Sequence, residues 1–424
     1  MGFPQALLAL LGAAGLAALI LLVLGSIYFE ATNSELPAGL EQPARLRVIH
    51  ACRIGAAGRI LENLHFCRQI QFVRLVRNAW TRRRDPALHI QDAAFEGIPV
   101  RLYLPKAPSA AGPRKGIVYF HAGGWLFGSL GEPRPRSLAS SKEERGAFLS
   151  TRRNTHARTD SVVVSVAYRL APEHRHPAQL NDCLAASTHF LKVAEDYGVD
   201  SSQVILAGNE AGGNLAARVC QILASRPGPA KVHAQILLCP ILQAVDFNLP
   251  SYQQNRAVPL LFRERAAFYL LQRLTGDASC LGDILEGSHV PMKLRAQYRK
   301  WLSVDHLQEE FKARGYKPTS CLSFKEDVCE ALGSLTLPEC SPLLAEEAVL
   351  SLLPETFILT CEYDVLRDDG LLYKKRLEDQ RVPVTWCHLA NGFHGIIEFF
   401  ESSWLGFPSG KKGVDDIVSF IKGL

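Results

Sequence analysis

The sequence lacks a C-x-x-C pair, although it holds eleven cysteines in 424 residues. Structural zinc sites and thioredoxin-type redox sites usually carry that pair, so no metal and no other cofactor is expected. The net charge of +5 is spread along the chain without a basic block, and nothing therefore favours a nucleic-acid partner. No N-x-S/T sequon occurs, so glycosylation cannot indicate on which side of a membrane the chain lies.

Charge is also absent from one long run near the N-terminus. The 24 residues from Ala6 to Phe29 contain no Asp, Glu, Lys or Arg, and a helix of that length crosses a hydrocarbon core of about 30 Å. The alternative is a cleaved secretory signal, but such signals begin with basic residues, and no Lys or Arg precedes this run. We therefore predict a single membrane anchor over residues 1–29.

The acidic residues that follow the run indicate its orientation. Glu30, Glu35 and Glu41 stand just after the span, whereas the first basic residue, Arg45, comes later. Together with the free amino group before the span, this order favours a cytosolic N-terminus and a lumenal body of the protein. Lumenal placement would permit one or two disulfides, with no pairing fixed by the sequence.

The remaining chain predicts one large α/β domain behind a helical cap, because 47% hydrophobic and 21% charged residues are typical of a folded chain. Residues 30–95 have the pattern of cap helices. From residue 96 to 424, short apolar strands alternate with helices, which indicates a mostly parallel sheet covered on both faces. Between about 246 and 340 the strand pattern lapses into helix-like and loop-like stretches, such as 260–274 and 301–314. We predict that this insertion, residues 246–340, is a lid, with surface elaboration as the alternative.

Two of the apolar strands lead into loops with chemical signatures. The strand 116–120 runs into His121-Ala122-Gly123-Gly124-Trp125, where glycines allow backbone N–H groups to approach a developing negative charge. The strand 204–207 runs into residues 208–216, G-N-E-A-G-G-N-L-A. Small residues around a sharp strand-to-helix turn expose the central side chain, which here is Glu210. Such a turn is called a nucleophile elbow when its central residue attacks the substrate. No G-x-S-x-G exists anywhere in the chain, so no second elbow with a serine at its centre is available.

Three further segments complete the pattern. Residues 168–174, Y-R-L-A-P-E-H, follow a strand and are interpreted as scaffolding. Asp364 lies in the loop 361–370, and His394 lies in the segment 391–395, N-G-F-H-G. The order elbow, acid, histidine is the one in which an acid orients an imidazole that acts as a base at the elbow.

These motifs, taken together, resemble the hormone-sensitive-lipase branch of the α/β hydrolases, over nearly all of the chain after residue 95. With its N-terminal anchor, the chain is most similar to the arylacetamide-deacetylase-like group and its divergent members. The resemblance implies an α/β-hydrolase fold, hydrolysis of lipophilic carboxylic esters or amides, and placement at the endoplasmic reticulum membrane. It also implies that Glu210, Asp364 and His394 occupy the catalytic positions, with Gly123, Gly124 and Ala211 as oxyanion donors. The basic stretch 131–160 departs from the family, as a disordered insertion or an incorrect exon.

Glu210 stands where the family has serine, and this changes the expected chemistry. Acyl transfer needs a hydroxyl or thiol whose proton the base removes, and a carboxylate at pH 7 has no proton to give. We hypothesise that the carboxylate enters the oxyanion hole and that His394, between two acids, is an imidazolium. One alternative is a carboxylate nucleophile that attacks carbon, as in relatives that cleave epoxides. The other is a lipid-binding or scaffold protein without turnover.

Overall fold

The computed structural model describes most of the chain after residue 36. The described ranges are 36–52, 88–106, 112–128, 158–228, 231–319, 324–400 and 406–424, with positions 70 and 74 and scattered residues between 13 and 32. Most of the predicted anchor, much of the predicted cap and residues 131–157 lie outside the described residues. Among the residues that are described, no helix combines the length and the hydropathy needed to cross a membrane.

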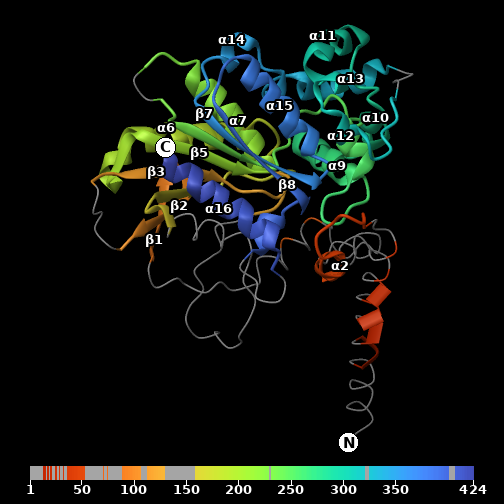
Figure 1. Ribbon diagram of the computed structural model, residues 1–424, viewed down its shortest axis with the longest axis horizontal. Helices are drawn as coiled ribbons and strands as arrows, with labels where there is room; N and C mark the ends of the chain where they lie inside the picture. The colour runs from red at the N-terminus through yellow and green to blue at the C-terminus, as the bar shows by residue number, and fades with distance from the viewer. Residues whose placement is uncertain are drawn as a thin grey trace, which may run out of the picture.

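An eight-stranded sheet forms the centre of the domain (Figure 1), in the order β1-β2-β4-β3-β5-β6-β7-β8. Its strands are β1 (Leu88–Phe95), β2 (Ile98–Pro105), β3 (Arg114–Phe120), β4 (Val162–Val166), β5 (Val199–Asn209), β6 (Ala234–Leu238), β7 (Glu355–Tyr363) and β8 (Val384–Phe393). The strands β4, β3, β5, β6, β7 and β8 pair in parallel in that order. At one edge of the sheet, β2 pairs antiparallel with β4, and β1 pairs antiparallel with β2. The predicted α/β-hydrolase architecture is confirmed.

Both faces of the sheet are buried, as its strand sequences require. The central strands β4 and β6 are buried at every residue, which explains their continuous apolar composition. One core lies under helices that cover one face, α6 (Ala178–Val193), α7 (Ala211–Ala224) and α15 (Arg367–Asp379). The other core lies under α16 (Pro408–Gly423) and α2 (Pro43–Cys52).

The insertion between β6 and β7 is helical, and its helices α9 to α13 gather at one end of the sheet (Figure 1). The α-helices of the whole insertion are α8 (Pro250–Gln254), α9 (Arg263–Leu274), α10 (Leu281–Glu286), α11 (Met292–Leu302), α12 (Glu309–Lys312), α13 (Glu326–Leu332) and α14 (Glu347–Leu350). The helix-like stretch 301–314 is broken, because Ser303 is extended and ends α11. That this insertion acts as a lid stays a prediction, and we use the name lid only as a label for residues 246–340.

One prediction of secondary structure is wrong. Helix was expected up to residue 95, but residues 88–95 form the strand β1, which pairs antiparallel with β2 along its whole length. The two strands join through Glu96 and Gly97, which both have positive φ, the geometry of a tight two-residue hairpin. The pairing with β2 therefore overrides the weak local pattern of β1.

Candidate functional site

Glu210 occupies a sharp turn between β5 and α7. Its φ of 54° and ψ of −112° are unusual for a residue with a side chain, and its backbone N–H donates to the Leu238 carbonyl at 2.9 Å. Its carbonyl accepts the N–H of Asn214, which fixes the first turn of α7. This strained backbone conformation places the Glu210 side chain at the N-terminus of α7, as the sequence predicts.

Two glycines make this turn sterically feasible. A Cβ on Gly208 would collide with the backbone carbonyl of Gly212, and a Cβ on Gly212 would collide with the carbonyl of Phe120. The neighbouring atoms are backbone and cannot move aside without displacing β3 or α7. The glycines flanking Glu210 are therefore required by close packing of the elbow against the strand that carries the oxyanion loop.

The loop after β3 lies against the elbow and is held from behind by Tyr168. The Tyr168 hydroxyl donates to the carbonyl of His121 at 2.7 Å, and the two rings stack with centroids 4.1 Å apart. Gly123 and Gly124 have positive φ, at 118° and 59°. This contact gives the segment 168–174 a scaffolding part, in agreement with its interpretation from sequence.

The carboxylate of Glu210 points into this loop. The N–H of Gly123 donates to its Oε2 at 3.1 Å, and the same oxygen lies 3.8 Å from Nε2 of His394. Of the three predicted oxyanion donors, Gly123 therefore contacts the carboxylate directly. Gly124 is the next residue of the loop, and Ala211 is the first residue of α7, directly after Glu210.

Asp364 and His394 form the second half of the arrangement. Asp364 follows β7 and His394 follows β8, so adjacent parallel strands deliver both side chains to one edge of the sheet. The Nδ1 atom of His394 lies 2.9 Å from Oδ2 of Asp364, while Oδ1 of that carboxylate accepts the N–H of Leu366 at 2.9 Å. Three residues from distant parts of the sequence thus form one continuous chain of polar contacts.

The electrostatic balance of this chain favours a protonated imidazole. Burial alone lowers the pKa of His394, because a charged ring is poorly solvated there. The charge and hydrogen bond of Asp364, followed by those of Glu210, outweigh burial and raise the pKa well above its usual value of 6.5. The two acids therefore favour the imidazolium form of His394, and in that form the ring cannot accept a proton as a general base.

Cysteines near the site do not supply a substitute nucleophile. Cys239 and Cys361 are buried free thiols with sulfur atoms 3.6 Å apart. The hydrogen bond to Cys361 and burial raise the pKa of Cys239 well above its usual range, and burial raises that of Cys361. Both are therefore uncharged and poorly reactive at neutral pH. In the described ranges, no three His, Cys, Asp or Glu side chains come together in a way that could hold a metal ion.

Sequence reasoning missed several residues that support the site. Asn209 donates to Glu398, which lies just after the histidine segment, at 3.3 Å. Asn255 and Arg314 of the lid donate to carbonyls in the segment that carries Asp364, residues 361–370, which we call the acid loop. Asn209 stands in the elbow motif, but its contact with Glu398 was not expected from the sequence. Asn255 and Arg314 belong to no motif and are brought to the site only by the tertiary fold, so no signal in a single sequence could have identified those two.

Comparison with known proteins agrees with this fold. The family described as alpha/beta hydrolase fold matches residues 117–280 and 303–398. A solved thermostable esterase from Pseudomonas putida superposes with a TM-score of 0.62 at 21% identity, covering 92% of this chain and 98% of the esterase. The fold and the family match thus define a member of the α/β-hydrolase class.

Curated relatives narrow that class. The human protein arylacetamide deacetylase-like 4 is 40% identical over 401 residues, covering 94% of this chain and 95% of the relative. Mouse arylacetamide deacetylase is 36% identical over 351 residues, covering 82% and 84% of the two chains. The chain belongs to the arylacetamide deacetylase family of ester and amide hydrolases.

Proposed function

We propose that this chain is a membrane-anchored family member that keeps a site for lipophilic ester or amide ligands but has lost hydrolysis by the serine mechanism. The observation that carries the proposal is the position of the Glu210 carboxylate, which accepts the Gly123 N–H and faces His394. A substrate carbonyl needs that N–H for its developing oxyanion. The Glu210 side chain therefore competes with the substrate carbonyl for the Gly123 N–H.

The protonation state of His394 supports the same proposal. Hydrolysis through a carboxylate nucleophile would still need His394 to take a proton from water in the second step. In the free protein, the raised pKa of His394 favours the charged ring, which cannot remove a proton from a nucleophile. An ester on Glu210 would no longer carry the carboxylate charge, so this raised pKa does not weigh against the second step of the epoxide-type alternative. The Gly123 N–H that the carboxylate already occupies is what favours a ligand-binding protein of impaired turnover.

Labelling with a fluorophosphonate tests the proposal. The probe transfers its phosphonyl group to an activated serine and releases fluoride. Because residue 210 is a glutamate, we expect no label at this position in the purified full-length protein. Glu210→Ser should be labelled at residue 210, because the oxyanion loop, Asp364 and His394 remain in place. The matched control is the double variant Glu210→Ser/His394→Ala, which should remain unlabelled. Failure of the single variant to react would contradict an otherwise intact hydrolase site.

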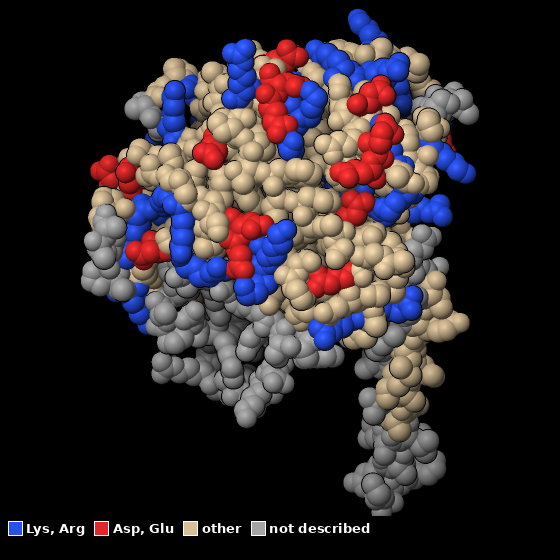
Figure 2. Space-filling model, in the orientation of Figure 1, with Lys and Arg blue, Asp and Glu red and all other residues tan. Residues whose placement is uncertain are grey.

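The membrane anchor and placement at the endoplasmic reticulum, with a lumenal domain, are also part of the proposal. Four large apolar side chains in the described part of the N-terminal segment are exposed: Ile20, Leu21, Leu24 and Tyr28. Figure 2 shows this segment projecting from the domain without a charged side chain among its described residues. Such surface is unfavourable in water and is stabilised in a bilayer. On the body of the protein, basic and acidic groups are intermixed on the face shown.

Alkaline carbonate extraction of microsomes tests the anchor. The full chain should remain in the membrane pellet, because an apolar span of about 20 residues is not released by breaking electrostatic contacts. A variant lacking residues 6–29 should move to the supernatant. Release of the full chain by carbonate would show that the N-terminal run is not a transmembrane anchor.

A further inference from the structure

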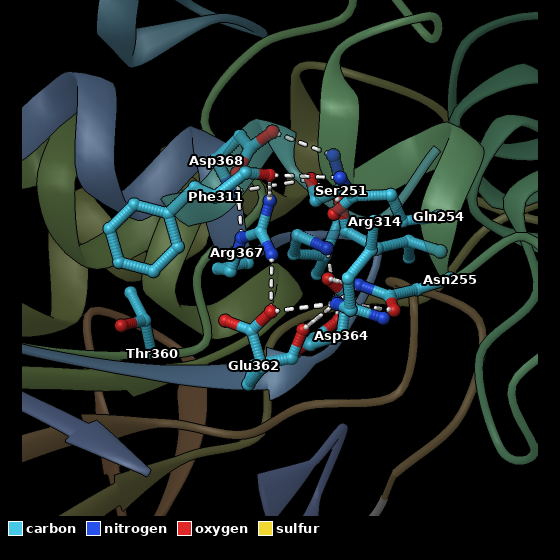
Figure 3. Close-up of polar contacts among 12 residues, drawn as sticks. Ser251, Gln254, Asn255, Phe311, Arg314, Thr360, Glu362, Asp364, Arg367 and Asp368 are labelled. Carbon is cyan, nitrogen blue, oxygen red and sulfur yellow. Dashed lines mark hydrogen bonds and ion pairs between the residues drawn. The ribbon is translucent and has the colours of Figure 1, made fainter. Parts of the chain in front are cut away.

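A buried polar cluster connects the lid to the loop that carries Asp364 (Figure 3). At its centre is Asn255, which directly follows α8 and is fully buried. The Nδ2 atom of its side-chain amide donates to the backbone carbonyl of Asp364 at 2.9 Å and to that of Glu362 at 3.1 Å. One lid side chain thus holds the backbone on both sides of Tyr363.

Arg314, also from the lid, fixes the orientation of this amide. Its guanidinium donates to Oδ1 of Asn255 at 3.2 Å and to the carbonyl of Glu362 at 3.0 Å. It also bonds the Glu362 carboxylate at 3.0 Å and lies over the ring of Tyr363, 4.7 Å from its centroid. Because the amide oxygen accepts from a cation, its nitrogen must face the two carbonyls and cannot exchange places with the oxygen.

Helix α8, which precedes Asn255, also contacts the part of the acid loop that follows Asp364. The Ser251 hydroxyl donates to the carbonyl of Val365 at 2.7 Å, and its backbone N–H donates to Asp368 at 2.6 Å. Arg367 returns the contact by donating to the carbonyl of Phe311 in the lid at 2.8 Å. The loop 362–368 is therefore fastened to the lid at both ends, and Figure 3 shows these groups converging from the two segments.

We propose that Asn255 is a positioning residue that sets the direction of the Asp364 carboxylate, so that docking of the lid and the Asp364–His394 contact form one unit. The carboxylate meets the imidazole at 2.9 Å, and such contacts depend on backbone placement within about 0.5 Å. Asn255 binds the carbonyl of Asp364 itself and the carbonyl of Glu362, two residues earlier, so it fixes the backbone from which the Asp364 side chain extends. This inference rests on the proposed pairing of Asp364 with His394.

The downfield N–H resonance of the His394 Nδ1 proton reports this contact directly. It is measured in the full-length protein and identified by its absence from His394→Ala. In Asn255→Ala the resonance should disappear or move upfield, because the freed loop lengthens the hydrogen bond to Asp364. The matched control is Gln253→Ala, since Gln253 lies on the same helix and its amide donates to the carbonyls of Asn248 and Lys317, both within the lid, rather than to the acid loop. Its resonance should stay in place.

A residue with a merely structural role would lower the unfolding temperature of the variant without moving this resonance. A folded Asn255→Ala protein that retains the wild-type resonance therefore overturns the proposal. If Asn255→Ala does not fold, Arg314→Ala carries the test, because Arg314 is partly exposed and orients the amide. An unmoved resonance in folded Arg314→Ala would overturn the proposal equally. The readout needs no turnover, so its failure is distinct from a failure of Glu210→Ser to gain activity.

Discussion

Replacing Glu210 by serine should turn a nearly inert protein into an esterase. In Glu210→Ser, the hydroxyl would stand at the same strained turn, and Gly123 would be freed to stabilise an oxyanion. Removal of one of the two carboxylates beside His394 should also let the imidazole lose its proton and act as a base. All three requirements of acyl transfer would then be met by residues already in place.

The expected gain is large. Loss of a serine nucleophile from such a site costs up to about 10⁶-fold in turnover, so we expect Glu210→Ser to exceed the wild type by roughly 10³-fold or more on short aryl and acyl esters. The measurement is kcat/KM of the purified full-length proteins. Glu210→Ala is the control and should gain nothing, because it frees Gly123 without supplying a nucleophile. Wild-type turnover that Glu210→Ala abolishes would contradict this account and would indicate a working carboxylate.

The sequence was sufficient to predict most of the fold because its strands are short apolar runs between recognisable turns. The pattern G-N-E-A-G-G-N placed Glu210 between a strand and a helix, and it lies there, between β5 and α7. The order of the motifs placed Asp364 and His394 in two later segments of one site, and parallel pairing of β7 with β8 brings them together. Local sequence fixes such turns because Gly208 and Gly212 have no sterically allowed replacement.

Contacts that depend on long-range packing could not be predicted in the same way. Asn255 and the acid loop are separated by more than 100 residues, and no periodicity places one against the other. The strand β1 was missed because its pairing with β2, and not its own composition, determines its conformation. The direction of the Glu210 side chain likewise depends on Gly123, which lies 87 residues earlier in the chain. A sequence reveals the residue types at a site more readily than their mutual geometry.

The charge state of His394 is the second large effect, and its sign follows from the two acids beside it. Asp364 and Glu210 raise the pKa of His394 against the opposing effect of burial. The protonated ring therefore stabilises the folded state fully below the unfolded value of about 6.5, and this contribution is lost as the pH rises through the higher folded value. Glu210→Gln keeps the shape of the side chain but removes its charge, so it should lower the pKa of His394 and reduce this contribution.

An NMR titration of the His394 imidazole in the wild type and in Glu210→Gln measures this directly. We predict a pKa well above 6.5 in the wild type and a lower pKa in Glu210→Gln, because the carboxylate of residue 210 contacts the ring in the folded protein. A wild-type pKa below 6.5, or a pKa that Glu210→Gln leaves unchanged, would contradict the pairing of Glu210 with His394 on which the proposed loss of hydrolysis depends.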